Sequence, residues 1–212
     1  MIAALMVATL SANAQNEVGQ VTLKPTVGLN IASMTKGLNS KVRPGLIAGV
    51  EAEYGVAENF GLSAGVLYSM QGVKESGNIA IDADEFGLGI INYDGKATTK
   101  LDYINIPILA QFYPTKGLAL KAGIQPGFCV NKKISYDGTA TVGTGTMPFN
   151  ETCKIGDGVV KSFQFAIPVG VSYEYQSFVL DARYNIYVTK AFKNGDSRHS
   201  VFSFTLGYKF AL

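Results

Sequence analysis

The 212-residue chain is long enough for one domain or at most two, and no stretch in its middle resembles a linker. Hydrophobic residues make up 47% of it and charged residues only 16%, yet after residue 15 no run approaches the ~20 apolar residues of a membrane-spanning helix. The formal net charge of +2 is small and evenly spread, which excludes the concentrated basic face of a nucleic-acid-binding protein. If this chain crosses a membrane, strands must cross it.

Residues 1–14 have the features of a secretory signal peptide. The segment is apolar and ends in Ser11-Ala12-Asn13-Ala14, an A-x-A cleavage pattern before Gln15. The alternative is a buried N-terminal helix. Signal peptides begin with basic residues and none precedes Lys24, so we expect the natural start to lie upstream. We predict export through the Sec pathway and a single domain over residues 15–212.

From residue 22 onward the chain repeatedly alternates apolar with small or polar residues, the period-2 pattern of strands with two different faces. In the last such run Phe202, Phe204 and Leu206 share one face, while Ser203 and Thr205 share the other. We expect about eight runs of this kind, with boundaries uncertain by ~2–4 residues, at 21–32, 44–55, 60–72, 101–113, 117–131, 162–175, 178–190 and 200–211. Many are ten or more residues long, as a tilted strand needs to cross a bilayer.

The connections between these runs alternate in length. Residues 56–59, 114–116 and 176–177 are expected to be tight turns, whereas 33–43, 73–100, 132–161 and 191–199 are longer and polar. Short turns at one rim and long loops at the other are typical of outer-membrane barrels. The sequence therefore predicts an all-β fold, an eight-stranded antiparallel up-and-down transmembrane β-barrel in the bacterial outer membrane.

Aromatic residues near the strand ends are expected to form two girdles at the membrane interfaces. The outer girdle is predicted from Tyr68, Phe128, Phe163 and Phe202, and the periplasmic girdle from Tyr54, Phe60, Phe112, Tyr175, Phe178, Tyr208 and Phe210.

If the apolar positions face lipid, the alternate positions face the lumen and carry balanced charges. These residues are Lys24, Glu51, Glu53, Lys121, Glu174, Asp181, Arg183 and Lys209. Buried charges are costly unless they are paired, and an eight-stranded barrel is just wide enough for side chains to fill. We therefore expect a paired charge network in a filled polar lumen. The alternative for these charges is an ion or proton path in a narrow porin-like channel.

Two cysteines and two long loops bear on recognition. Cys129 and Cys153 can form a disulfide in an oxidising compartment, or remain two free thiols. The loops 73–100 and 132–161 are longer than a connection needs, so we expect a protein or glycan partner there, in addition to outer-membrane lipid. Nucleic acid is not an expected partner, no cofactor or metal is expected, and the barrel is expected to be a monomer.

The chain resembles the PorT-like family of outer-membrane β-barrel domains. The resemblance rests on Lys24-Pro-Thr-Val-Gly-Leu-Asn30, Gly45-Leu-Ile-Ala-Gly-Val-Glu-Ala-Glu-Tyr54, Leu101-Asp-Tyr-Ile-Asn-Ile-Pro-Ile-Leu-Ala-Gln-Phe-Tyr113 and the closing Leu206-Gly-Tyr-Lys-Phe210. It covers essentially the whole mature chain, and Tyr103-Ile-Asn-Ile-Pro107 is its most specific piece. The resemblance implies an eight-stranded, porin-like barrel of Gram-negative outer membranes and implies little about activity.

Three other functions fit the sequence less well than a structural or recognition role. His199 beside Ser200 suggests a lipid hydrolase, but strand neighbours point to opposite faces, so we expect no catalysis and a solvated histidine. Asp82, Asp84 and Glu85 are better explained as a solvated acidic loop than as a calcium site. A soluble lipocalin-like barrel would turn the apolar face inward around an apolar ligand.

Overall fold

A computed structural model describes residues 18–34, 40–82, 90–142, 145–156, 159–192 and 198–212, and these residues are almost entirely β-structure. The strands are β1 (Val21–Met34), β2 (Ser40–Lys41), β3 (Arg43–Ala57), β4 (Phe60–Asp82), β5 (Ile90–Asn105), β6 (Ile108–Thr115), β7 (Leu118–Val142), β8 (Gly145–Lys154), β9 (Phe163–Tyr175), β10 (Phe178–Tyr187), β11 (His199–Tyr208) and β12 (Phe210–Ala211). Within the described residues, no helix is long and apolar enough to cross a membrane.

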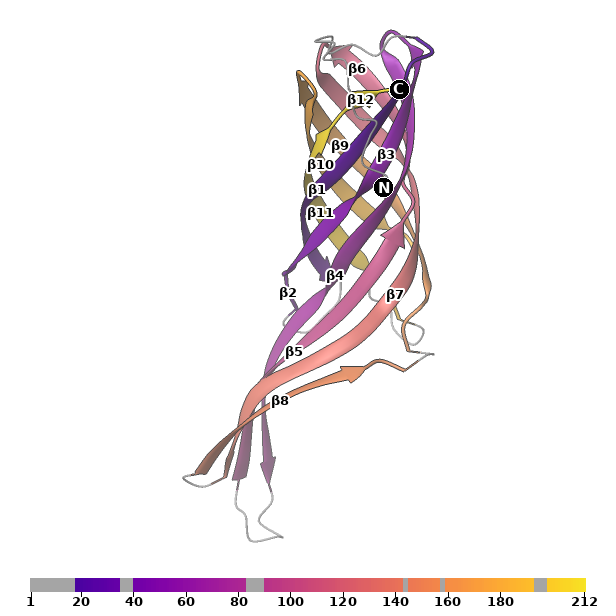
Figure 1. Cartoon of the computed structure of the whole chain (residues 1–212). Coiled ribbons are helices and arrows are strands. Elements are labelled where there is room, and N and C mark those ends of the chain that lie inside the picture. Colours follow the sequence, from indigo (N-terminus) through magenta and orange to yellow (C-terminus); the bar gives the residue numbers. More distant parts are fainter. Residues whose placement is uncertain (1–17, 35–39, 83–89, 143–144, 157–158, 193–197) are drawn as a thin grey trace, which may run out of the picture.

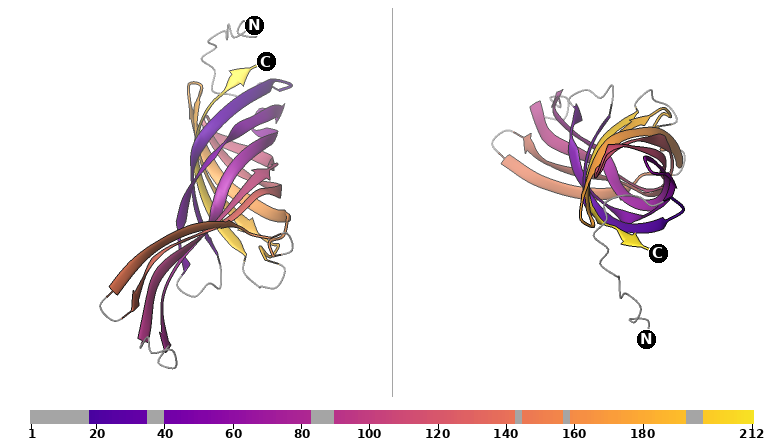
Figure 2. Two further views of the ribbon diagram at one scale, coloured as in Figure 1. Left: turned by 60° about the horizontal axis from the view of Figure 1, so that its bottom comes forward. Right: turned by 90° about the horizontal axis from the view of Figure 1, so that it is seen from above.

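The strands close into an antiparallel ring. Its order is β1, β3, β4, β5, β7, β9, β10 and β11, and β1 also pairs with β11, which joins the two ends of the sheet. β5 and β6 occupy one position in the ring, because both pair with β4 and β7. β11 and β12 likewise occupy one position, because both pair with β1. The predicted eight-stranded up-and-down barrel is confirmed, and the view down the axis shows the closed ring (Figure 2).

Tight turns and the C-terminus lie at one end of the barrel (Figure 1). The turn between β6 and β7 uses Gly117 at φ +79°, and that between β9 and β10 uses Gln176 at φ +57°. The turn between β3 and β4 contains only Glu58 and Asn59. Short turns mark the periplasmic rim of outer-membrane barrels, so the opposite end corresponds to the extracellular rim of such barrels.

The barrel wall is apolar outside and polar inside, as the alternation predicts. On β11, Phe202, Phe204 and Leu206 are about half exposed, whereas Ser203 is buried. Aromatic pairs line the wall at both levels predicted as girdles. Phe178 and Tyr208 meet edge to face near the tight turns, and Phe128 and Phe163 do so nearer the other end.

The segments 73–100 and 132–161 were expected to be loops, and most of their described residues are strands instead. β4 and β5 stay in register from Leu67↔Asn105 to Asp82↔Ile90, and β7 pairs with β8 from Lys133↔Lys154 to Val142↔Gly145. The ladder between β5 and β7 also continues outward to Ile91↔Val142. Together these strands form a four-stranded sheet that leaves the barrel beyond its extracellular rim and projects to one side (Figures 1 and 2). We call this sheet the extension.

The sequence prediction missed the extension because a sheet bathed by water on both faces needs no hydrophobic alternation. Its strands are rich in Lys, Thr, Asp and Gly, which are also the residues of loops. Residues 83–89, 143–144 and 157–158 of the two predicted loops, together with 35–39 and 193–197, lie outside the described residues, as do the signal-peptide prediction at 1–14 and the acidic residues Asp84 and Glu85.

Candidate functional site

Five of the predicted lumen charges meet in the middle of the barrel. The Arg183 guanidinium donates to both Glu51 carboxylate oxygens, at 2.6 and 2.7 Å. Lys24 lies 2.8 Å from Glu51, and Lys121 donates to Asp181 at 2.7 Å. Asp181 also accepts from Arg183 at 3.0 Å. Three cations and two anions thus form one buried cluster with a formal charge of +1.

The other three predicted charges meet near the periplasmic rim. Lys209 donates to Glu174 at 3.0 Å and lies 3.3 Å from Glu53, while the Tyr113 hydroxyl donates to Glu53. One cation and two anions give this group a formal charge of −1, which balances the central cluster. Pairing of this kind offsets much of the desolvation cost of buried charges.

Glycines on the facing strands leave the room that the central cluster occupies. A Cβ on Gly65 would lie 2.6 Å from the Glu51 Cγ, and one on Gly170 would lie 2.9 Å from the Arg183 Cγ. Both contacts are far shorter than van der Waals contact. Glycines on the inward face therefore admit the long charged side chains.

A neutral polar layer lies on the extracellular side of the charges. The Asn30 amide donates to Ser69 at 2.8 Å, and Gln71 donates to Ser69 and to the Tyr187 hydroxyl at 2.9 and 2.8 Å. Ser203 donates to the Asn30 carbonyl oxygen at 2.7 Å. Sequence reasoning overlooked this layer, although its Asn, Gln and Ser residues occupy the same inward positions as the charges.

An apolar cluster fills the lumen at the extracellular mouth. Its buried members come from five segments and are Met34, Val73, Leu101, Tyr103, Val160 and Ala191, with Cys129, Ile155 and Phe192 packed against them. Val160 and Phe192 also pair through an isolated β-bridge, which joins two of the connecting segments across the mouth. The sequence carried no signal for this plug because its members are scattered along the chain.

Little free space remains between the charge cluster and the neutral polar layer. A cavity of about 10 Å³ remains between the central charge cluster and the neutral polar layer. Arg183, Asn185 and Ser203 are among the residues that line it. A single water molecule needs at least about 10–15 Å³ of such space. At this level the described lumen is filled by polar side chains.

His199 differs from its prediction, whereas Ser200 lies on the opposite face of the strand as expected. His199 is buried against the Tyr103 and Tyr187 rings, so the expectation of a solvated histidine is wrong. Ser200 lies on the other face of β11, where its hydroxyl bonds with that of Tyr184 at 2.9 Å. Among the described residues no group of Asp, Glu, His and Cys could hold a metal ion.

The disulfide is not formed, and Cys129 and Cys153 are free thiols. Cys153 pairs with Ile134 on the β7–β8 ladder, five residues along β7 from Cys129. At ~3.3 Å per residue this places the two cysteines on the order of 16 Å apart. A disulfide requires Cα atoms within ~7 Å.

Comparison with known families accounts for this architecture. Residues 13–193 match the model of the outer membrane protein beta-barrel domain. The chain belongs to this family. It is therefore a barrel of the bacterial outer membrane, and its apolar outer wall faces lipid. The lipocalin alternative is wrong, because the apolar residues point outward and the inward face is polar.

Solved structures with a similar fold include other small outer-membrane barrels. The attachment invasion locus protein Ail of Yersinia pestis, solved with the heparin analogue sucrose octasulfate, is 15% identical, with a TM-score of 0.42, and the match covers 92% of this chain and 100% of that one. Neisserial surface protein A is 14% identical (TM-score 0.48; 90% and 97% covered). OprG from Pseudomonas aeruginosa is 10% identical (TM-score 0.41; 94% and 98% covered). No curated protein sequence matches this chain significantly.

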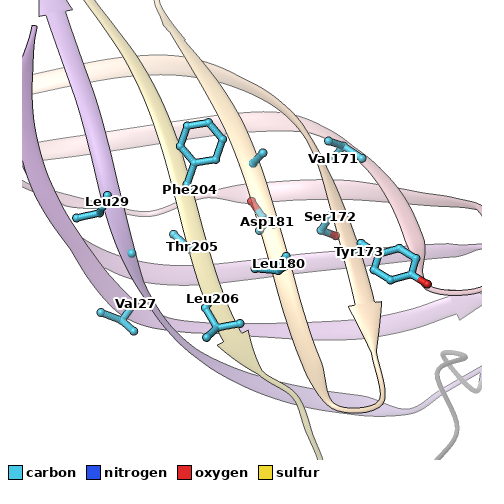
Figure 3. A pocket seen from close by; sticks show the side chains of 12 residues that line it. Val27, Leu29, Val171, Ser172, Tyr173, Leu180, Asp181, Phe204, Thr205 and Leu206 are labelled. Atoms are coloured by element: carbon cyan, nitrogen blue, oxygen red, sulfur yellow. The ribbon is translucent and has the colours of Figure 1, made fainter.

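The outer wall of this outer-membrane barrel has one hollow of about 550 Å³ over β9, β10, β11 and β1 (Figure 3). Leu29, Phe204, Leu180 and Tyr173 border it. These side chains are all about half exposed on the lipid-facing surface. The hollow therefore lies on the surface that faces the acyl chains of the bilayer.

Proposed function

We propose that this outer-membrane barrel is a closed, non-enzymatic support that displays the extension as a recognition surface outside the cell. The observation that carries the proposal is the contrast between the two halves of the molecule. The lumen is packed from the periplasmic ion pairs to the apolar plug, so little can pass through it. The extension consists of the outer segments of β4, β5 and β7 together with β8, and the ring closes without these segments.

The edge strand β8 supports a recognition role. All but one of its side chains are exposed, and within the described residues β8 pairs with β7 alone. An exposed edge presents unpaired backbone groups to a partner, and polar side chains on a rigid sheet bind with little ordering cost. The partner class is a protein or a glycan.

Shortening the extension tests this proposal. Glu75 and Ala97 are register partners, as are Ser135 and Thr152, so a two-residue turn between the members of each pair removes both hairpin ends without changing the register. The shortened chain should fold, because the ring ladders lie below these pairs. Cells expressing it should lose binding to arrays of immobilised glycans and matrix proteins that the full chain supports.

Equal binding by cells with the full and the shortened chain would contradict the recognition role. If the cells that carry the shortened chain also become sensitive to detergent, the extension has a structural role instead. A stepwise conductance in planar bilayers would favour the narrow channel instead.

The proposal includes a precursor exported by the Sec pathway, PorT-like membership, a mature domain over residues 15–212 and a monomeric barrel. The A-x-A pattern before Gln15 and the Tyr103-Ile-Asn-Ile-Pro107 strand support the first two. N-terminal sequencing of the protein extracted from outer membranes should begin at Gln15. Light scattering in detergent should give the mass of one chain.

A further inference from the structure

Three lysines lie directly opposite one another across three neighbouring strands at the base of the extension. Lys100 on β5 pairs with Lys133 on β7, and Lys133 pairs with Lys154 on β8. Side chains of directly opposed residues share one face of a sheet and lie about 4.5–5.5 Å apart at Cβ. Lys74 of β4 pairs with Thr98, which lies two residues from Lys100 on β5. Lys74 is therefore on the same face as Lys100, one side-chain position farther from the barrel. We call Lys74, Lys100, Lys133 and Lys154 the lysine row.

No partner within the described residues neutralises the row. None of the four lysines takes part in an ion pair with a described residue, whereas the charges of the central cluster and of the periplasmic group all do. The nearest carboxylate on this face is that of Asp102, which is buried and accepts hydrogen bonds from Tyr68 and Asn131. Like charges placed directly opposite destabilise a sheet. An anion from outside the chain would remove that cost.

The face that carries the row is the outward continuation of the lipid-facing wall. On β4 the exposed Tyr68 and then Lys74 occupy alternate positions of one face. On β7 the register shifts by one residue between the pairs Tyr103↔Cys129 and Asp102↔Asn131. Val130 is the extra residue of this bulge, so Lys133 shares the outer face with Phe128.

The height of the row above the hydrocarbon follows from strand geometry. Lys133 lies three residues beyond the exposed Val130, which is about 10 Å along the strand and about 7–8 Å of height at a tilt of 35–45°. The headgroup region of each leaflet is about 5–8 Å thick. Lysine side chains at this height reach the phosphate level.

We propose that the lysine row is a binding site for phosphate groups of outer-leaflet lipid headgroups, at the base of the extension. The charge complementarity, the absence of ion pairs with the described residues and the height of the row all point to this occupant. A lysine close to an anionic lipid surface contributes to binding by electrostatic attraction, which salt weakens. The site would position the extension against the membrane surface, and it needs only the extracellular placement of the extension, not its recognition role.

The free thiol of Cys153 allows a direct test, because it is exposed and adjacent to Lys154 on β8. The full chain carrying Cys129→Ser is labelled at Cys153 with a donor dye and reconstituted in phosphatidylcholine nanodiscs with one-fifth phosphatidylglycerol. Energy transfer is compared between acceptor-labelled phosphatidylglycerol and acceptor-labelled phosphatidylcholine. We expect about five-fold enrichment of the anionic lipid, the factor that one lysine near an anionic surface provides, and a decline at high salt.

The test variant is the triple substitution Lys100→Gln, Lys133→Gln and Lys154→Gln. The control, Lys96→Gln, Lys116→Gln and Lys161→Gln, removes the same charge from three lysines outside the row. The test variant should lose the enrichment and the control should keep it. A heat-dependent shift in gel mobility shows that each variant has folded.

Three outcomes would overturn the proposal. They are equal transfer to both lipids, equal loss in the test and control variants, and binding of a soluble sulfated polysaccharide that depends on the row while the lipid enrichment is absent. Failure here leaves the array result for the shortened extension unaffected, since the shortened chain retains all four lysines of the row.

Discussion

Arg183 on β10 and Glu51 on β3 form a two-bond ion pair across the width of the lumen, with N–O distances of 2.6 and 2.7 Å. The two strands are not neighbours in the sheet, so this contact joins opposite walls of the barrel. Such a cross-barrel pair stabilises only the closed ring, because no flat or open arrangement of the strands would bring the two side chains together.

Glu51→Gln should destabilise the closed barrel. The substitution leaves Arg183 and Lys24 with a single buried carboxylate, that of Asp181, and breaking a buried pair costs about 3–5 kcal/mol. The folded barrel is expected to migrate faster than the unfolded chain on a gel. When samples are heated to increasing temperatures before loading, the Glu51→Gln variant should lose this fast-migrating form at a lower temperature. The exposed turn variant Glu58→Gln should behave like the unchanged protein, and equal melting of the two variants would contradict the assigned role of Glu51.

Gly65→Ala should destabilise the same cluster by steric conflict. The new Cβ would lie 2.6 Å from both the Glu51 Cγ and the Val50 carbonyl oxygen, and overpacking of this kind costs about 1–3 kcal/mol. Denaturation in urea with vesicle-embedded protein measures the change. Gly77→Ala in the extension is the control, since its Cβ would meet nothing within 4 Å, and it should leave stability unaltered.

His199→Phe should leave the barrel at least as stable as before. Neither ring nitrogen has a hydrogen-bond partner in the described part of the chain, and the ring is surrounded by Tyr103 and Tyr187. Replacing an unsatisfied buried polar group by an apolar one of similar shape is neutral or stabilising, by up to about 1–3 kcal/mol. The unfolding midpoint checks this, and a marked drop would show that the imidazole makes a bond that matters.

The two thiols should react independently and at different rates. Cys153 is exposed and should be modified rapidly by a maleimide polymer in mild detergent, whereas Cys129 packs beneath the mouth plug and should react only after heating. Two mass increments after heating without reductant are expected. A protein that reacts only after reduction would mean that the cysteines are bonded.

The sequence alone determined the wall of this barrel. Alternation of Phe202, Phe204 and Leu206 with small or polar residues specifies which face meets lipid, because a strand reverses its side-chain direction at every residue. The same parity assigned Glu51, Asp181 and Arg183 to the lumen, where the structure brings them together. The positions of the tight turns could be predicted from the sequence, because such turns favour particular residue types and contain few residues.

Only the tertiary structure decided what the inward and outward residues contact. Whether Glu51 meets Arg183 or Lys209 depends on the stagger of a closed ring, which no local pattern encodes. The apolar plug at the extracellular mouth depends on the same closure of the ring, because it joins side chains as distant in sequence as Met34 and Ala191. The extension depends on pairing between strands that have water on both faces, so no hydrophobic pattern in the sequence specifies its register. Only the paired strands of the structure show that Lys100, Lys133 and Lys154 lie opposite one another.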